Sequence, residues 1–314
     1  MPPRHHKLLP WIALGVIWVV WGSTYLAIRV VVREMPPFAA ASLRFFAAGI
    51  VMGALALRTD RAHGRPTRRQ LLDYAFVGVL LLSIGNAIVM WAEKTIPSGI
   101  AALIVATTPL WLTLFDGLRR GGQRWTGRVW AGTLVGLVGV ALVARPSSGA
   151  ASGHWAGILA LQVGALSWSV GLLYAQSVPK RLPLFTASAV EMLVGSAVLF
   201  VESLVFGEDM GAIASASPAA WAGLVYLAVF GSLVGFTAFA YCLNELPAST
   251  VGTYAYVNPV VAVVLGAVIL GEPLYLGLLA GAGLILLAVL LSTTGRRPRT
   301  AAAGRETIAV SESA

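Results

Sequence analysis

Residues 9–32 read LPWIALGVIWVVWGSTYLAIRVVV, and Arg29 is the one charged side chain among these 24 residues. A helix needs roughly 20 apolar residues to cross a bilayer core of about 30 Å, so this stretch is long enough to span a membrane. It is too long for the apolar region of a secretory signal, and no small-residue cleavage site follows it. We therefore interpret residues 9–32 as the first transmembrane helix.

Further stretches of similar length and composition follow along the whole chain. Because backbone groups in lipid must bond within their own segment, each stretch is expected to be a helix. The fold class is therefore all-α integral membrane, with ten expected spans at residues 9–32, 37–57, 71–92, 98–118, 126–145, 154–176, 184–206, 218–242, 248–270 and 274–293. Residues 296–314 are polar or small and are expected to form a flexible cytoplasmic tail.

The composition and the charge pattern support a membrane protein. Of the 314 residues, 58% are hydrophobic and 11% are charged, whereas a soluble domain carries roughly 25% charged residues. The net charge of +9 comes from short basic clusters between apolar runs, a pattern that favours a topology signal over a nucleic-acid surface. The single cysteine, Cys242, excludes an internal disulfide and indicates a buried thiol.

The basic residues also predict the orientation of the chain. One side of the expected topology carries 17 Lys and Arg, and the other side carries only three, which are Arg33, Lys94 and Arg145. Lys and Arg in short loops favour the cytoplasmic side. Both termini are therefore expected in the cytoplasm.

The chain matches itself at a fixed offset, which indicates an internal repeat. At an offset of 147 residues, Trp21 and Phe38 fall on Trp168 and Phe185. At an offset of 150 residues, Gly85, Pro97, Pro109, Gly121 and Gly127 fall on Gly235, Pro247, Pro259, Gly271 and Gly277, and Trp91 and Trp125 fall on Tyr241 and Tyr275. The expected units are residues 9–145 and 154–293. Because each holds an odd number of spans, the second must insert upside down, which gives two inverted five-helix repeats.

Several motifs resemble a known family. They are Trp21-Gly22-Ser23-Thr24-Tyr25, Pro36-Pro37, Leu43-Arg44-Phe45 and Leu270-Gly271-Glu272-Pro273. Together they resemble the EamA-type branch of the drug/metabolite transporter superfamily, and the likeness covers residues 9–293. The resemblance implies a carrier of the plasma (inner) membrane, commonly an exporter of amino acids, metabolites or drug-like compounds. The first half has Gly121-Gly122-Gln123 where the second has Gly271-Glu272-Pro273, so the acidic turn occurs in one half only.

Polar and aromatic side chains within the spans are candidates for a substrate cavity. The candidates are Trp21, Ser23, Tyr25, Asn86, Trp91, Gln162, Trp168, Tyr241, Tyr256 and Asn258. Trp and Tyr near span ends can instead belong to the aromatic belt of the membrane interface. The three amides are deeper, and buried amides need partners, which can be substrate or internal water.

Two charged residues and two prolines also lie inside expected spans. Arg44 and Glu191 correspond at the offset of 147 residues and are expected about 10 Å apart along the membrane normal. Charged groups inside a membrane are candidates for function, so Glu191 could couple transport to protons, and Arg44 could equally be a structural contact. Pro109 and Pro259 each remove a helix hydrogen bond, which makes a hinge or a packing kink.

These features favour a secondary transporter that moves a small organic solute by alternating access. A channel-like facilitator and a non-transporting receptor remain alternatives. Residues 122–129 lack the Lys and Ser/Thr of a phosphate loop, so no nucleotide is expected. No histidine lies within the apolar part of a span, so neither a metal, a cofactor nor an enzyme activity is expected. Small residues at Gly132, Gly136, Gly277 and Gly281 allow close helix packing, which leaves both a monomer and a homodimer open.

The few deep charges also predict the character of the cavity. We expect it to be neutral and aromatic, and to select bulky amphipathic or apolar solutes over highly charged ones. Lipid and the small-molecule substrate are the expected partners, and no nucleic acid is expected.

Overall fold

The computed structural model describes residues 8–60, 64–119, 126–143, 154–179, 181–246 and 248–294, and all regular secondary structure within them is helical. The first half contains α1 (Leu9–Val32), α2 (Pro37–Thr59), α3 (Arg68–Gly78), η3 (Val79–Asn86), α4 (Ala87–Ala92), α5 (Ser98–Val105), α6 (Thr108–Leu118) and α7 (Gly127–Val143). The second half contains α8 (His154–Ser177), α9 (Leu184–Val205), α10 (Gly211–Ser215), α11 (Pro218–Tyr226), η4 (Leu227–Val234), α12 (Gly235–Glu245), α13 (Ala248–Val251), α14 (Tyr254–Leu270) and α15 (Leu276–Thr294).

Within these described residues, seven helical stretches are long and apolar enough to cross a membrane. Three of them are composite: a π-helical segment joins α3 to α4, another joins α11 to α12, and the stretch Ser98–Leu118 consists of α5 and α6. Shorter apolar helices occupy Gly127–Val143, Tyr254–Leu270 and Leu276–Leu291. The chain is thus a multi-pass membrane protein.

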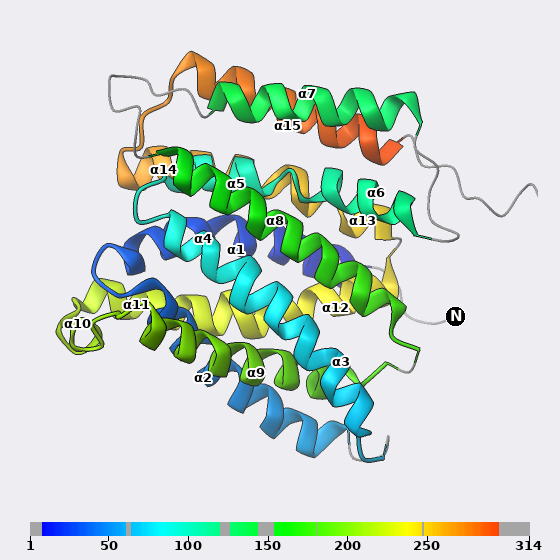
Figure 1. Ribbon diagram of the computed structural model, residues 1–314, viewed down its shortest axis with the longest axis vertical. Helices are drawn as coiled ribbons and strands as arrows, with labels where there is room; N and C mark the ends of the chain where they lie inside the picture. The colour runs from blue at the N-terminus through cyan, green and yellow to red at the C-terminus, as the bar shows by residue number, and fades with distance from the viewer. Residues whose placement is uncertain are drawn as a thin grey trace, which may run out of the picture.

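Helices from the first half of the chain pack against helices from the second half. The α2 helix lies along α9, and α7 lies along α15 at one edge of the molecule (Figure 1). The contacts between the halves also come in matched sets, because α1 packs on α14 as α5 packs on α8. The start of α1 and the end of α15 lie on the same side of the molecule, opposite α10 (Figure 1).

Acidic side chains cap the N-termini of α2 and α9. Glu208 accepts the backbone N–H groups of Phe38 and Ala39 at the start of α2, at 3.1 and 2.8 Å. Asp60 accepts the backbone N–H and the hydroxyl of Thr186 at the start of α9, at 2.9 and 2.8 Å. Each carboxylate satisfies donors that a helix N-terminus leaves unpaired, and its charge is favourable beside the positive end of the helix dipole. Each helix of the pair is therefore capped by an acidic residue from the segment that follows the other helix.

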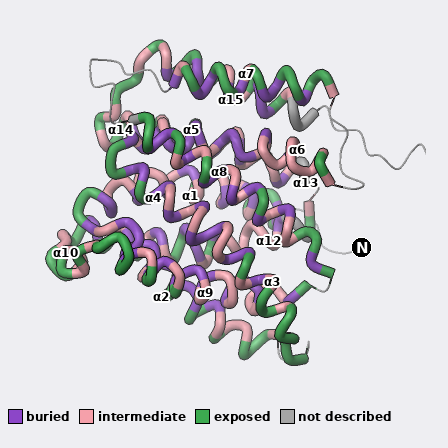
Figure 2. The backbone as a smooth tube through the Cα atoms, viewed as in Figure 1, coloured by how far each residue is buried: buried purple, intermediate pink, exposed green. Residues whose placement is uncertain are grey.

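The outer surface is apolar, as expected for a protein that contacts lipid. Exposed residues follow the outer faces of the peripheral helices, while buried residues line their inner faces (Figure 2). Val268 is 79% exposed and Leu276 is 83% exposed. Large apolar side chains at this exposure are costly in water and neutral in hydrocarbon.

The structure corrects the expected continuity of two spans. The segment expected as one helix over residues 98–118 breaks after Val105, and α6 starts at Thr108, so Pro109 lies in the first helical turn and not in an interior. A proline is tolerated there because the N–H that it lacks would have no helical partner. The segment at 248–270 breaks between α13 and α14, and Pro259 lies inside α14. The expected tail at 296–314, as well as Pro247, Gly121 and Trp125, falls outside the described residues.

Candidate functional site

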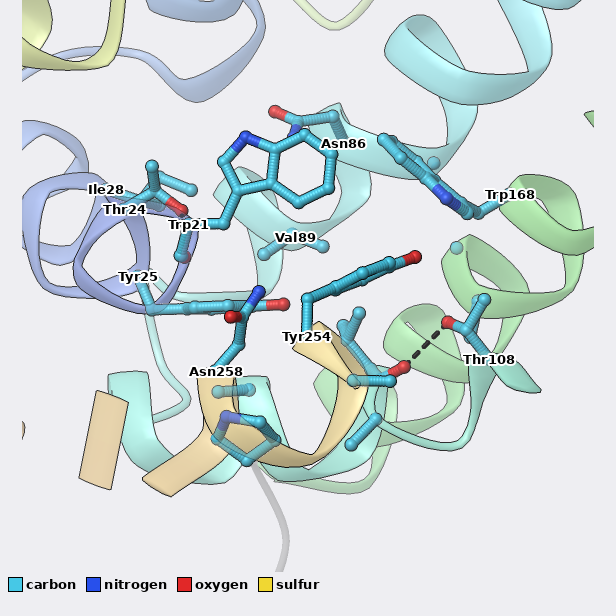
Figure 3. Close-up of a pocket in the computed structure, with 18 of the residues that line it drawn as sticks. Trp21, Thr24, Tyr25, Ile28, Asn86, Val89, Thr108, Trp168, Tyr254 and Asn258 are labelled. Carbon is cyan, nitrogen blue, oxygen red and sulfur yellow. Dashed lines mark hydrogen bonds between the residues drawn. The ribbon is translucent and has the colours of Figure 1, made fainter. Parts of the chain in front are cut away.

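A cavity lies in the centre of the helical bundle. About 880 Å³ of space in it is not filled by protein atoms, and this space includes the part that is open to solvent. Its wall comes from both halves of the chain and is formed by Trp21, Thr24, Tyr25, Ile28, Arg44, Gly85, Asn86, Val89, Ala102, Val105, Ala106, Thr108, Pro109, Gly164, Ala165, Trp168, Gly231, Phe236, Tyr254, Ala255, Asn258 and Pro259. Figure 3 shows the rings of Trp21, Trp168 and Tyr254 around this space.

Residues of α1 follow one helical face toward the cavity. Trp21, Thr24, Tyr25 and Ile28 all line it, and their spacing of three, four and seven places them on the same side of a helix. This spacing was visible in the sequence. The prediction named Trp21 and Tyr25 but chose the hydroxyl of Ser23 and not that of its neighbour Thr24, and it left out Ile28 because that side chain is aliphatic.

Each of the two corresponding tryptophans rests on a glycine of the opposite half. A Cβ atom at Gly235 would collide with the indole of Trp21, and one at Gly85 would lie 3.1 Å from the Trp168 ring. These two glycines correspond at the offset of 150 residues. The absence of a side chain at both positions lets the indoles approach the opposite backbone and face the cavity.

Trp21 is held by a polar contact and by ring contacts. Its Nε1–H donates to the carbonyl of Gly231 in η4, at 3.2 Å. Its ring centroid lies 5.7 Å from Phe236, 5.1 Å from Phe239 and 5.3 Å from Tyr254. Aromatic pairs at these separations are favourable, so the indole has a defined orientation at the cavity wall.

Arg44 is the charged residue of the wall. It lies in α2 and is 3% exposed, and its Nε–H donates to the hydroxyl of Ser232 in η4 at 3.0 Å. Its Nη1 donates to the Oδ1 of Asn86 at the end of η3, at 3.3 Å. The guanidinium also lies over the ring of Phe45, 4.7 Å from its centroid. The wall is therefore aromatic, as expected, but it is not neutral, because Arg44 lines it. The expectation of a neutral wall was wrong because the sequence does not reveal which way Arg44 faces.

The amide of Asn258 is occupied by the protein itself. In the orientation that satisfies its surroundings, its nitrogen donates to the carbonyls of Trp18 and Tyr254, at 3.1 Å each. Asn258 therefore ties α14 to α1 while it lines the cavity. Pro259, which follows it, removes the hydrogen bond that would reach the carbonyl of Ala255, another residue of the wall.

Five residues proposed from the sequence lie outside this cavity. Ser23 hydrogen-bonds to the Tyr226 hydroxyl at 2.6 Å. Gln162 accepts from the indole N–H of Trp111 at 2.9 Å and lies beside a separate, smaller cavity. Trp91 is 40% exposed, Tyr256 packs against the cluster of Leu110, Ala288 and Val289, and Tyr241 is absent from the wall.

Glu191 also lies away from the cavity. Its backbone lies against Gly78 of α3, where a Cβ atom would collide with it. The contact brings α9 close to α3, as expected where glycine permits close helix approach. The structure therefore does not place Glu191 opposite Arg44, its counterpart in the expected repeat.

A second buried charge cluster lies at the end of α4, and the sequence interpretation did not single it out. Glu93 is completely buried, and neither of its carboxyl oxygens has a hydrogen-bond partner. Arg29 donates to the backbone carbonyl of Glu93. The carboxyl group of Glu93 interacts electrostatically with Arg29, Tyr25 and Glu272. Burial is the main cause that raises the pKa of Glu93 well above its usual range; the charge of Glu272 adds to this and that of Arg29 opposes it.

Glu272, in the acidic turn before α15, caps the start of α5. Its carboxylate accepts the backbone N–H groups of Ser98 and Gly99 at 2.8 and 3.1 Å, at the start of α5. The turn residue of the second half thus caps a helix of the first half. In the described part of the chain, no group of three or more His, Cys, Asp or Glu could hold a metal ion.

A bundle of apolar helices around an internal cavity is the architecture of a multi-pass membrane protein. The chain belongs to the EamA-like transporter family, whose sequence profile matches residues 9–145 and 155–294. It is therefore a transporter.

Relatives extend over nearly the whole chain. A protein of Escherichia coli K12 named "Uncharacterized inner membrane transporter YedA" is 39% identical over 296 residues, which cover 93% of this chain and 94% of the relative. A protein of Streptantibioticus cattleyicolor named "Probable terminal-alkyne amino-acid exporter" is 29% identical, covering 93% and 97% of the two chains. A crystal structure with 22% identity superposes with a TM-score of 0.64 and covers 90% of this chain and 96% of that chain, which shows the same fold.

Proposed function

We propose that this chain is a secondary transporter that exports small organic solutes by alternating access through the central cavity. The solutes are of the class of amino acids, metabolites or drug-like compounds. The direction is supported by the relative named an exporter. The proposed units are two inverted five-helix repeats at residues 9–145 and 154–293, with both termini in the cytoplasm.

The observation that carries this proposal is that corresponding positions of the two halves line the same cavity. At the offset of 150 residues, Asn86 corresponds to Phe236, Thr108 to Asn258 and Pro109 to Pro259, and all six line the cavity. Inverted repeats around a central site allow the two halves to exchange conformations, which opens the site to one side and then to the other. The matched positions support this mechanism because the same wall can form in either state.

The two π-helical segments support the same proposal. η3 and η4 are offset by 148 residues, since they start at Val79 and Leu227, and each lies within the third span of its half. π-Helical turns occur frequently at functional sites. The end of η3 supplies Asn86 to the wall and η4 supplies Gly231, so a change in either segment would change the cavity.

The experiment is a flux assay with the full chain in proteoliposomes. A carrier saturates with solute and shows counterflow, in which unlabelled solute on one side drives labelled solute from the other. Flux that is linear in concentration and lacks counterflow would support a channel-like facilitator, and no flux for any solute would support a receptor. A panel of amino acids, amines, organic acids and sugars covers the proposed classes.

Two variants connect the flux to particular residues. Trp168→Ala removes an aromatic wall and should weaken transport of aromatic solutes more than that of small polar ones. Trp91→Ala is the matched control, because Trp91 lies outside the cavity. Equal effects of both variants on every solute would remove Trp168 from the proposed site.

Glu191 remains the proposed group for proton coupling. Glu191→Gln should abolish accumulation driven by a pH gradient and leave exchange without a gradient intact, if the carrier depends on that carboxyl group. Accumulation that survives in this variant would remove Glu191 from the coupling mechanism.

A further inference from the structure

Arg44 places a positive charge at a cavity wall that offers it no negative partner. The guanidinium group is permanently protonated and is almost completely buried. Its polar contacts, Ser232 and Asn86, are both neutral. Neither an aspartate nor a glutamate lines the cavity, and the described residues show no carboxylate within ion-pair distance of Arg44.

The lack of a negative partner for Arg44 matters because the surroundings are apolar. A buried charge is costly unless an opposite charge or several hydrogen bonds compensate it. The guanidinium carries five N–H donors, and the two hydrogen bonds described above use one from Nε and one from Nη1. Its Nη2 lies beside Gly231, where an added Cβ would be only 3.0 Å away. Gly231 itself lines the cavity.

The rest of the cavity wall determines which kind of negatively charged solute would fit beside Arg44. Trp21, Trp168 and Tyr254 surround the space with aromatic faces, which favour an apolar or aromatic body. One positive charge balances one negative charge, whereas a dianion such as a phosphate monoester would leave an unbalanced charge in an apolar cavity. The ammonium group of an amino acid would likewise find no carboxylate in the wall.

We propose that Arg44 binds the carboxylate of a monoanionic organic acid whose apolar or aromatic body lies against Trp21, Trp168 and Tyr254. The planar guanidinium matches a carboxylate through parallel N–H···O bonds. Ser232 and Asn86 hold the guanidinium from the two π-helical segments, one in each half. This inference rests on the proposed transport function, because it assigns the substrate class of the same cavity.

Binding of a matched probe series to the full chain in lipid nanodiscs tests the inference. Phenylpropionate, phenylpropanol and phenylpropylamine share one aromatic body and differ in the charge of one end group, and phenylalanine adds an ammonium group to the acid. Phenylpropionate should bind at least about tenfold more tightly than the other three, because a hydrogen-bonded charge is worth this much. Equal affinity for the alcohol and the acid in the native chain would overturn the inference without any variant.

Substitutions then identify the charge responsible. Arg44→Gln should reduce phenylpropionate affinity about tenfold to 100-fold and leave phenylpropanol affinity nearly unchanged. Arg44→Lys keeps the charge without the planar fork and should retain part of the preference. Arg33→Gln removes an exposed positive charge at the end of α1 and serves as the matched control. Loss of acid binding in the control, or its retention in a folded Arg44→Gln protein, would contradict the assignment.

Flux measurements separate this inference from the transport proposal. If phenylpropanol shows saturable counterflow and phenylpropionate binds no better, the inference fails and the transport proposal stands. If phenylpropionate binds in an Arg44-dependent way and neither these probes nor the wider solute panel shows counterflow, the assignment of Arg44 as a carboxylate-binding residue stands and the transport proposal fails.

Discussion

At the scale of single residues, glycine controls where the cavity tryptophans lie. Trp21 occupies the space that a side chain at Gly235 would fill. We expect Gly235→Ala to displace the indole from the wall and to weaken binding of an aromatic solute about fivefold, since an aromatic contact contributes roughly 1 kcal/mol beyond its burial. Solute binding and tryptophan fluorescence of the purified protein measure this effect.

The control for this prediction is Gly15→Ala, which lies on the same helix as Trp21 and has no atom within 4 Å of the added Cβ. This variant should keep native affinity and native thermal stability. If both variants behave alike, the position of Trp21 does not determine affinity.

A second prediction at this scale concerns the buried carboxyl group of Glu93. Because burial raises its pKa, the folded protein holds a proton on this group over a pH range in which the unfolded chain, with a pKa of about 4.3, has lost it. Stability therefore falls as the pH rises from about 4.3 through the raised pKa. Glu93→Gln removes this dependence, so the variant should be more stable than the native chain at pH 8, and the difference should shrink toward pH 4.

Thermal unfolding in detergent across this pH range is the measurement. The groups that interact with the Glu93 carboxyl are Tyr25, Arg29 and Glu272. A Glu93→Gln protein that is less stable than the native chain at pH 8 would show that attraction to Arg29 outweighs the cost of burial.

At the scale of elements, reciprocal capping explains how α2 and α9 hold their register. We expect Asp60→Ala and Glu208→Ala each to reduce the free energy of unfolding by about 1 kcal/mol, the usual value of a helix cap. The two sites lie at opposite ends of the 23-residue helix α2, about 34 Å apart. Their effects should therefore add in the double variant.

Equilibrium unfolding of the single and double variants measures this additivity. Asp209→Ala is the control, because the Asp209 carboxylate accepts the N–H of Gly211 within its own loop. A double variant much less stable than the sum would indicate that the two ends of the helix pair are coupled.

The elements also show how far the sequence could predict this protein. Apolar length predicted the helical segments, and the inventory of polar and aromatic side chains in the first span included Trp21 and Tyr25, which line the cavity. Residues such as Gln162 and Trp91 were misplaced because both faces of a membrane helix are apolar, so hydropathy does not reveal which face turns inward. The π-helical turns in η3 and η4 and the break after Val105 also change the helical phase, and no composition signal marks them.

At the scale of the whole molecule, the orientation in the membrane is the remaining prediction, and exposed sites in both halves test it. Arg33 and Asp209 are exposed in the α1–α2 and α9–α11 connections, while Arg65 and Arg181 are exposed near the starts of α3 and α9. The first two connections lie on the side of α10, and the starts of α3 and α9 lie on the opposite side (Figure 1). The excess of basic residues predicts that the second side faces the cytoplasm.

Cysteines introduced one at a time at these four positions, in a Cys242→Ala background, should therefore react differently in intact cells. Cys242 is itself fully buried. A membrane-impermeant maleimide should label positions 33 and 209 and spare positions 65 and 181, whereas a permeant maleimide should label all four. Inside-out vesicles should reverse the impermeant pattern. The opposite pattern in cells would refute the cytoplasmic termini, and labelling that separates position 33 from 209 would refute the inverted arrangement, because five spans per half require these two connections to share one face.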